Sequence, residues 1–157
     1  MNMLELTSNS PEETQRIGAS LGACAQPGDV LLLCGDLGAG KTCLTQGIAK
    51  GLDVEGYVRS PTFVLVTIHQ GRLPLYHIDI YRLDHVAEVI ELGLEEYLAG
   101  NGVSVIEWAD KAPEAFPEDC LRVTLDTIGE DSRLLRLHPT GTRYEELALA
   151  LRNRLHD

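Results

Sequence analysis

The amino-acid sequence predicts a single domain of the α/β class, with helices on both faces of a mostly parallel sheet that antiparallel hairpins extend. Two observations lead to this prediction. With 157 residues, 44% of them apolar, the chain is long enough for one sizeable hydrophobic core, and we expect residues 1–157 to form one domain. Apolar segments typical of strands also alternate along the chain with amphipathic segments typical of helices.

The first third of the chain predicts strand, helix, strand and helix in that order. Leu4–Thr7 fits a short strand. Ser10–Glu13 then offers a cap residue, a proline at the first helical position and a glutamate three residues after the cap, so a helix should run from here to about Ala25. The apolar run Val30–Cys34 predicts a buried strand, and a second helix is expected over Lys41–Lys50.

The middle of the chain predicts a β-hairpin followed by a helix. Residues 62–69 and 73–81 are rich in β-branched and aromatic side chains, and Gln70-Gly71-Arg72 separates them as a turn. A helix is expected to begin at Asp84. Its predicted apolar stripe consists of Val86, Ile90, Leu94 and Tyr97.

The last third predicts a short buried strand, a second hairpin and a closing helix. Val103–Glu107 is almost uniformly apolar and ends in a carboxylate. Leu121–Asp126 and Arg133–Leu137 form the expected hairpin. The sequence Thr-Arg-Tyr-Glu from Thr142 predicts a capping box for a helix that ends near Leu155.

Charge and composition exclude several classes of function. The 13 basic and 24 acidic residues give a net charge of −11, which repels nucleic acid, so we expect no direct binding to DNA and no tight unaided binding to tRNA. No apolar run reaches membrane-spanning length, and no basic residue precedes Arg16. We therefore expect a cytoplasmic protein that makes no membrane contact. Its four cysteines form no C-x-x-C pair and are expected to be reduced thiols.

The segment from Gly35 to Thr42 has the spacing of a phosphate-binding loop, Gly-x-x-x-x-Gly-Lys-Thr, directly after a predicted strand. Its glycines allow backbone N–H groups to surround a phosphate, and the following helix start favours an anion. Lys41 would reach the β- and γ-phosphates, and the Thr42 hydroxyl would ligate Mg²⁺. The residues expected to bind nucleotide are Asp36, Gly38, Ala39, Gly40, Lys41, Thr42 and Cys43. The fold class thus becomes a P-loop NTPase-like three-layer sandwich.

Such a site requires a second Mg²⁺ anchor at the end of a neighbouring strand. Glu107 is the first choice, because it ends the most apolar strand after the loop. Asp79 could orient the attacking water or hold the metal through a water molecule. His77 and Asp79 would share one strand face, but without a third ligand they do not predict an independent metal site.

Two further features bear on the nucleotide. Ser60-Pro61-Thr62 could sense the γ-phosphate by ordering the Thr62 hydroxyl against the metal, or it could merely set a turn before a strand. No Asn-Lys-x-Asp sequence of the kind that recognises guanine is present, so adenine or weak base selectivity is expected.

Five segments together resemble the bacterial TsaE (YjeE-type) ATPase family. They are Gly35–Thr42, Ser60–Phe63, His77–Leu83, Glu91–Leu94 and Val105–Ala109. The resemblance implies a small cytoplasmic P-loop ATPase that is needed to make threonylcarbamoyladenosine in tRNAs reading codons that begin with A. In that family the protein acts with TsaD, the transferase that modifies the tRNA, and with TsaB, so tRNA is reached only through the complex.

The resemblance also assigns roles by position. It implies that Thr42 and Glu107 hold Mg²⁺, that Asp79 supports hydrolysis and that the segment around Thr62 acts as a switch. By a looser alignment, Thr14 and Arg133 would lie near the adenine. The expected catalytic residues are Asp79, Glu107, Lys41 and Thr62, with ATP and Mg²⁺ as cofactors.

No arginine is clearly placed to complete the site, although Arg59 and Arg82 are candidates. Hydrolysis should therefore be slow unless partners complete the site. Two other functions remain open from the residues alone. One is a small-molecule kinase, and the other is a nucleotide-binding assembly factor whose hydrolysis is incidental.

Overall fold

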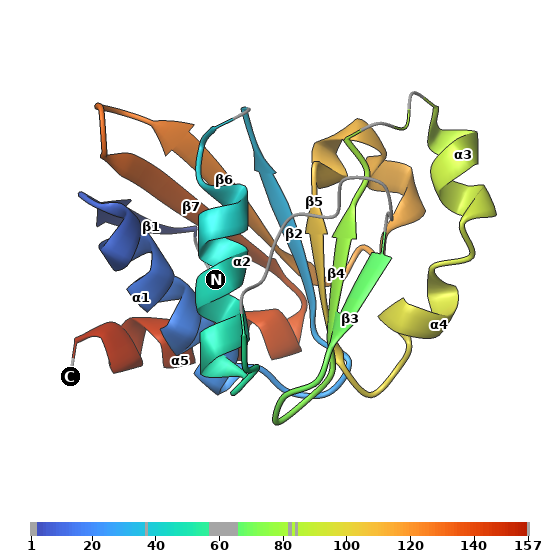
Figure 1. Cartoon of the computed structure of the whole chain (residues 1–157), viewed down its shortest axis with the longest axis horizontal. Helices are drawn as coiled ribbons and strands as arrows, with labels where there is room; N and C mark the ends of the chain where they lie inside the picture. The colour runs from blue at the N-terminus through green and yellow to red at the C-terminus, as the bar shows by residue number, and fades with distance from the viewer. Residues whose placement is uncertain (1–2, 37, 57–65, 82, 84, 157) are drawn as a thin grey trace.

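The computed structural model describes residues 3–36, 38–56, 66–81, 83 and 85–156. Within them, seven strands form one sheet in the order β1-β7-β6-β2-β5-β4-β3 (Figure 1). The strands are β1 (Leu4–Ser8), β2 (Val30–Gly35), β3 (Val66–His69), β4 (Leu75–Asp79), β5 (Val103–Glu107), β6 (Cys120–Thr127) and β7 (Arg133–Thr140). The four central strands β6, β2, β5 and β4 are parallel, whereas β1, β7 and β3 pair antiparallel at the two sides. The parallel centre and both antiparallel hairpins confirm the prediction.

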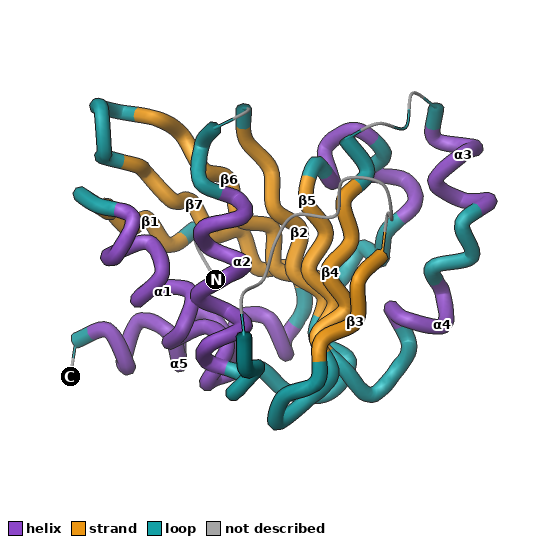
Figure 2. Tube along the Cα trace, in the orientation of Figure 1, coloured by secondary structure: helices purple, strands orange, loops and turns teal. Residues whose placement is uncertain are grey.

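Helices cover both faces of this sheet. Helices α1 (Pro11–Cys24), α2 (Lys41–Gly51) and α5 (Thr142–Leu155) lie on one side, and α3 (Val86–Glu91) and α4 (Glu95–Leu98) lie on the other (Figures 1 and 2). Short 3₁₀ turns at Ala109–Lys111 and Pro113–Ala115 also pack on the second side. The protein is therefore a three-layer α/β sandwich, as predicted.

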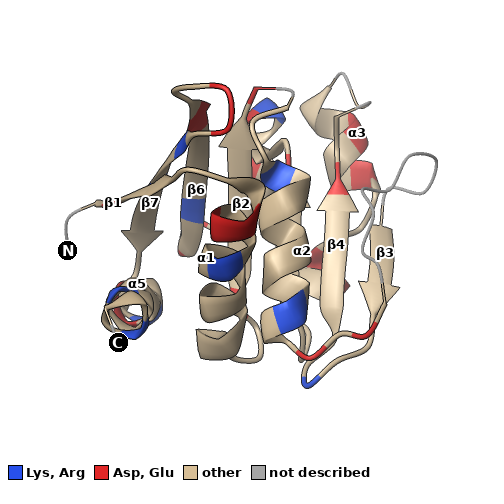
Figure 3. Cartoon of the chain, turned by 60° about the vertical axis from the view of Figure 1, so that its left-hand side comes forward, with Lys and Arg blue, Asp and Glu red and all other residues tan. Residues whose placement is uncertain are grey.

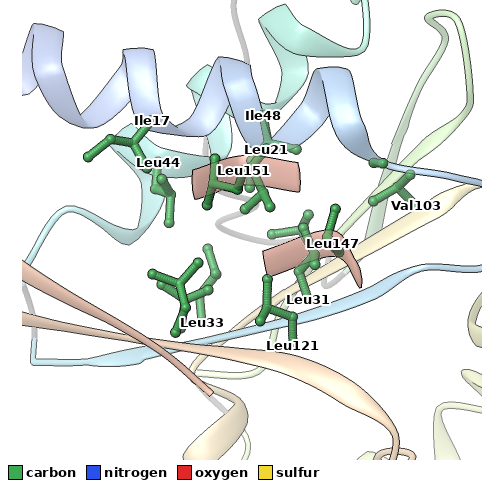
Figure 4. Packing of buried hydrophobic residues seen from close by; sticks show 14 of the residues in the cluster. Ile17, Leu21, Leu31, Leu33, Leu44, Ile48, Val103, Leu121, Leu147 and Leu151 are labelled. Carbon is green, nitrogen blue, oxygen red and sulfur yellow. The ribbon is translucent and has the colours of Figure 1, made fainter. Parts of the chain in front are cut away.

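The core lies in two clusters, one on each face of the sheet. Leu31 and Leu33 of β2 point toward α1, α2 and α5, where Leu44 and Leu147 meet them (Figure 4). The intervening Leu32 packs on the opposite side with the α3 layer. Because both faces of β2 are covered, its sequence is a continuous apolar run rather than an alternating one.

Helices α1 and α2 lie side by side at backbone contact distance (Figure 3). A Cβ at Gly47 would lie 2.2 Å from the carbonyl oxygen of Gln15, and one at Gly51 would lie 2.1 Å from that of Ala19. No side chain larger than hydrogen fits at these points. This close packing holds α1 next to the loop that precedes α2.

The helix predicted from Asp84 is wrong in its extent and in its buried face. Two short helices, α3 and α4, replace it, because Gly93 adopts a φ of +65° and ends the first of them. Val89 and Leu94 are buried, whereas Ile90 is 55% exposed. The break rotates the second half of the segment, so the predicted single stripe does not form. Asp84 itself lies outside the described residues.

The caps of the two long outer helices differ from each other. At α1, the backbone N–H of Glu13 donates to Ser10 Oγ at 3.1 Å, which confirms the predicted cap. At α5, the predicted capping box is wrong, because Thr142 is already helical and Gly141, with a φ of +96°, is the cap residue. The backbone N–H groups of Tyr144 and Glu145 both donate to the Gly141 carbonyl at 3.1 Å.

None of the helices in the described part of the chain has the length and apolar character needed to cross a membrane. The nearest candidates by length, α1 and α5, are amphipathic and carry charged residues on their outer faces.

Candidate nucleotide-binding site

The glycine-rich loop joins the carboxyl end of β2 to the start of α2. Gly35, Gly38 and Gly40 all have positive φ, at +146°, +81° and +102°. At Gly35 a Cβ would also lie 2.5 Å from the carbonyl oxygen of Leu125, so this position requires glycine on two grounds. Residue 37 lies outside the described residues. The three described glycines of the loop therefore adopt the positive φ values that were expected of them from the sequence.

Lys41, the first residue of α2, reaches back into this loop. Its ammonium donates to the carbonyl oxygens of Gly35 at 2.6 Å and Asp36 at 2.8 Å, and it lies 3.7 Å from the ring centroid of Trp108. Burial lowers the pKa of Lys41, and the nearby carboxylates, Glu107 first among them, oppose that shift. A desolvated ammonium held at the mouth of the loop is suited to attract a phosphate.

Glu107 is the last residue of β5 and lies against the start of α2. Thr42 Oγ1 donates to Glu107 Oε1 at 3.0 Å, and the glutamate is only 2% exposed. The Nε2 atom of His77 contacts the other carboxylate oxygen, Oε2. The two residues predicted to hold Mg²⁺, Thr42 and Glu107, are therefore in direct contact although 65 positions separate them in the chain.

Asp79 ends the neighbouring strand β4 and is the register partner of Glu107. It is 8% exposed, and its Oδ1 accepts a hydrogen bond from the backbone N–H of Tyr81 at 2.9 Å. Because parallel strands end at the same edge of the sheet, both predicted carboxylates meet beside the glycine-rich loop.

A cavity of about 210 Å³ lies on the other side of the loop. It is lined by Pro11, Thr14, Gly38, Gly40, Cys43, Asp131 and Arg133. One Nη atom of Arg133 donates to the Gly38 carbonyl at 3.3 Å, and Cys43 Sγ lies 3.4 Å from the Pro11 carbonyl. The structure thus brings Thr14 and Arg133, which the looser alignment suggested, to one cavity beside the loop, together with Cys43 of the predicted nucleotide-binding segment.

Some predicted residues cannot be placed, and others were missed. Thr62, the rest of the proposed switch segment, Arg59 and Arg82 lie outside the described residues. Sequence reasoning missed the contact of Trp108 with Lys41, that of His77 with Glu107 and the place of Asp131 in the cavity wall. The two-residue spacing of His77 and Asp79 was the available signal for the second contact.

The fold and the site define an α/β protein of the P-loop type, with a glycine-rich loop, a lysine and two strand-end carboxylates at one edge of a parallel sheet. A family model described as threonylcarbamoyl adenosine biosynthesis protein TsaE matches residues 8–135. The chain belongs to the TsaE family.

Individual relatives agree with this assignment. The chain is 44% identical over 148 residues to a tRNA threonylcarbamoyladenosine biosynthesis protein TsaE of Bacillus subtilis, covering 94% of this chain and 92% of the relative. A TsaE protein of Treponema pallidum is 37% identical over 130 residues, covering 83% of this chain and 96% of its own. The crystal structure of YdiB from Bacillus subtilis superimposes with a TM-score of 0.86 at 40% identity, covering 98% and 96% of the two chains.

Proposed function

We propose that this protein binds ATP with Mg²⁺, hydrolyses it slowly and thereby supports the threonylcarbamoyladenosine modification of tRNA. The observation that carries the proposal is the contact between Thr42 and Glu107 at the mouth of the glycine-rich loop, in a chain of the TsaE family. The protein would act in the cytoplasm with a TsaD-like transferase and a TsaB-like protein, as a nucleotide-dependent switch or reset factor.

The described residues fit a nucleoside triphosphate. The loop backbone would surround the phosphates, and Lys41 would contact the β- and γ-phosphates from the position it already holds beside Gly35 and Asp36. The adjoining cavity, with the Pro11 and Thr14 side chains on its wall, would take the adenine. Arg133 lies at the boundary between the two parts.

The same site fits Mg²⁺, because a hydroxyl and a carboxylate are hard oxygen donors of the kind this ion prefers. Thr42 and Glu107 would hold it. When bound, Mg²⁺ would supply positive charge that neutralises the transferring group. Asp79 would orient the attacking water from the next strand, 8% exposed at the edge where Glu107 lies.

The charge of the molecule supports a partner-dependent role. A net charge of −11 disfavours direct contact with tRNA, so the protein would reach its target through the complex. The segment around Thr62 remains our candidate for a switch that senses the γ-phosphate. A partner that supplies an arginine could raise the rate by about 10³–10⁵.

The test is phosphate release from ATP by the purified protein, alone and with a TsaD–TsaB pair. We expect little turnover alone, a large rise with partners and loss of hydrolysis with retained ATP binding in Glu107→Ala. Equal slow turnover in both cases would favour an assembly factor. Phosphate transferred to a metabolite rather than to water would favour a kinase, and absence of ATP binding would overturn the proposal.

A further inference from the structure

His77 lies in the middle of the site without a role in the function proposed so far. It belongs to β4, with Thr67 of β3 and Val105 of β5 as its register partners. Its side chain is completely buried, at 0% exposure. Its Nδ1 atom has no hydrogen-bond partner among the residues that the structure describes. A buried imidazole with an unpaired nitrogen is unfavourable unless its other nitrogen makes an interaction of value.

That interaction is the contact of Nε2 with Oε2 of Glu107. An ionised carboxylate only accepts hydrogen bonds, so the imidazole N–H donates. The second oxygen, Oε1, accepts from Thr42 Oγ1 at 3.0 Å. The two oxygens of Glu107 are thus held by side chains from two different elements, His77 on β4 and Thr42 on α2. A carboxylate held at both oxygens has one orientation rather than several.

We propose that His77 is a positioning residue, which fixes the Glu107 carboxylate so that Thr42 and Glu107 face Mg²⁺ in the geometry the ion requires. This inference rests on the proposed function. Removing a group that hydrogen-bonds to a metal ligand and orients it typically lowers metal affinity by about tenfold to hundredfold. Mg²⁺ tolerates little departure from octahedral geometry, so a free-swinging carboxylate would weaken its binding.

The experiment measures ATP affinity by titration calorimetry, once in EDTA and once across a Mg²⁺ series, for the whole protein and its variants. In His77→Leu we expect ATP affinity in EDTA to stay within about twofold, because Lys41 and the loop are intact. The factor by which Mg²⁺ increases ATP affinity should fall by about tenfold or more. His77→Gln should recover most of it, because its amide N–H reaches the position of Nε2.

A matched control is His69→Leu on the adjacent strand β3. His69 also has a buried nitrogen without a partner among the described residues, and within that part of the chain the imidazole that contacts Glu107 is His77, not His69. It should keep the full Mg²⁺ effect. If His77→Leu does not fold, His77→Asn, whose amide is too short to reach Oε2, takes its place in the comparison with His77→Gln.

The outcomes separate the two proposals. A wild-type protein that binds ATP no better with Mg²⁺ would overturn the proposed metal site and this inference together. A normal Mg²⁺ effect in the wild type that persists in His77→Leu, or equal behaviour of His77→Asn and His77→Gln, would overturn the role of His77 alone. Loss of the Mg²⁺ effect on ATP affinity in His77→Leu, with recovery in His77→Gln, would support the role of His77. A residue that only fills buried space would not need an N–H group at the position of Nε2.

Discussion

The ammonium of Lys41 lies 3.7 Å from the ring centroid of Trp108, the only tryptophan in the chain. The Trp108 ring also packs against the ring of Tyr81, with centroids 4.7 Å apart and planes tilted by 42°. A cation over the face of an indole ring is attracted by its π electrons. The residue that would contact phosphate therefore touches the one indole fluorophore of the protein.

We expect ATP to change the intrinsic fluorescence of Trp108, because phosphate oxygens compete with the ring for the Lys41 ammonium. The measurement is a fluorescence titration with ATP in the presence of Mg²⁺. In Lys41→Ala the starting signal should differ and the ATP response should disappear. An unchanged ATP response in that variant would show that Trp108 senses something other than the lysine.

Alkylation of Cys43 should be slow and should be slowed further by ATP. Burial, with a smaller contribution from the Glu12 carboxylate, raises the pKa of the Cys43 thiol. A raised pKa means less thiolate at a given pH, so reaction with iodoacetamide should be slower than for a free cysteine and should increase as the pH rises.

Cys43 also lines the cavity assigned to the adenine, so bound ATP should cover it. The rate is followed at each cysteine by peptide mass spectrometry, with Cys24 as the internal control because it is partly exposed and lies outside that cavity. An ATP effect equal at both cysteines would argue against adenine in the cavity.

Gly51→Ala should lower the free energy of unfolding by about 1–3 kcal/mol, the usual effect of overpacking a tight contact. The added Cβ would lie 2.1 Å from the Ala19 carbonyl oxygen, so the two helices must separate. Urea unfolding measures the loss. Gly129→Ala is the control, since its Cβ would lie no closer than 3.4 Å to Ser132, and it should change stability by less than about 0.5 kcal/mol.

Arg143→Ala should destabilise the fold by about 1–3 kcal/mol, because the buried Asp29 carboxylate loses two charged hydrogen bonds and keeps the one from the Gln26 N–H. Arg143 donates to both oxygens of Asp29, at 2.9 and 2.7 Å, and Asp29 is 2% exposed. Thermal unfolding of Arg143→Ala, compared with that of a control variant at the exposed Arg152, Arg152→Ala, measures the loss. Similar losses in the two variants would mean that the pair contributes no more than a surface arginine.

The features that sequence alone could predict are local ones. The glycine spacing predicted the loop before Lys41. The positions of Glu107 and Asp79 at the same edge of the sheet followed from their places at the ends of neighbouring parallel strands. The division of the helix at Gly93 escaped prediction, because the apolar spacing fitted one continuous helix, whereas in the structure the positive φ of Gly93 ends α3.

Some contacts between side chains of different elements escaped prediction for another reason. His77 meets Glu107 across 30 positions, and that meeting depends on the register of β4 against β5. Asp131 reaches the cavity from the turn between β6 and β7, which no local pattern connects to α1. The register and packing between elements, which no local pattern specifies, limited the prediction.

The backbone contact between α1 and α2 has a consequence for how the site can open. With glycine at the contact, no side chain separates the two backbones, so Pro11 and Thr14 of α1 are held close to the start of α2. The opposite wall, Asp131 and Arg133, belongs to the hairpin of β6 and β7. If the cavity widens to admit a nucleobase, we therefore expect the change at the hairpin end rather than between the two closely packed helices.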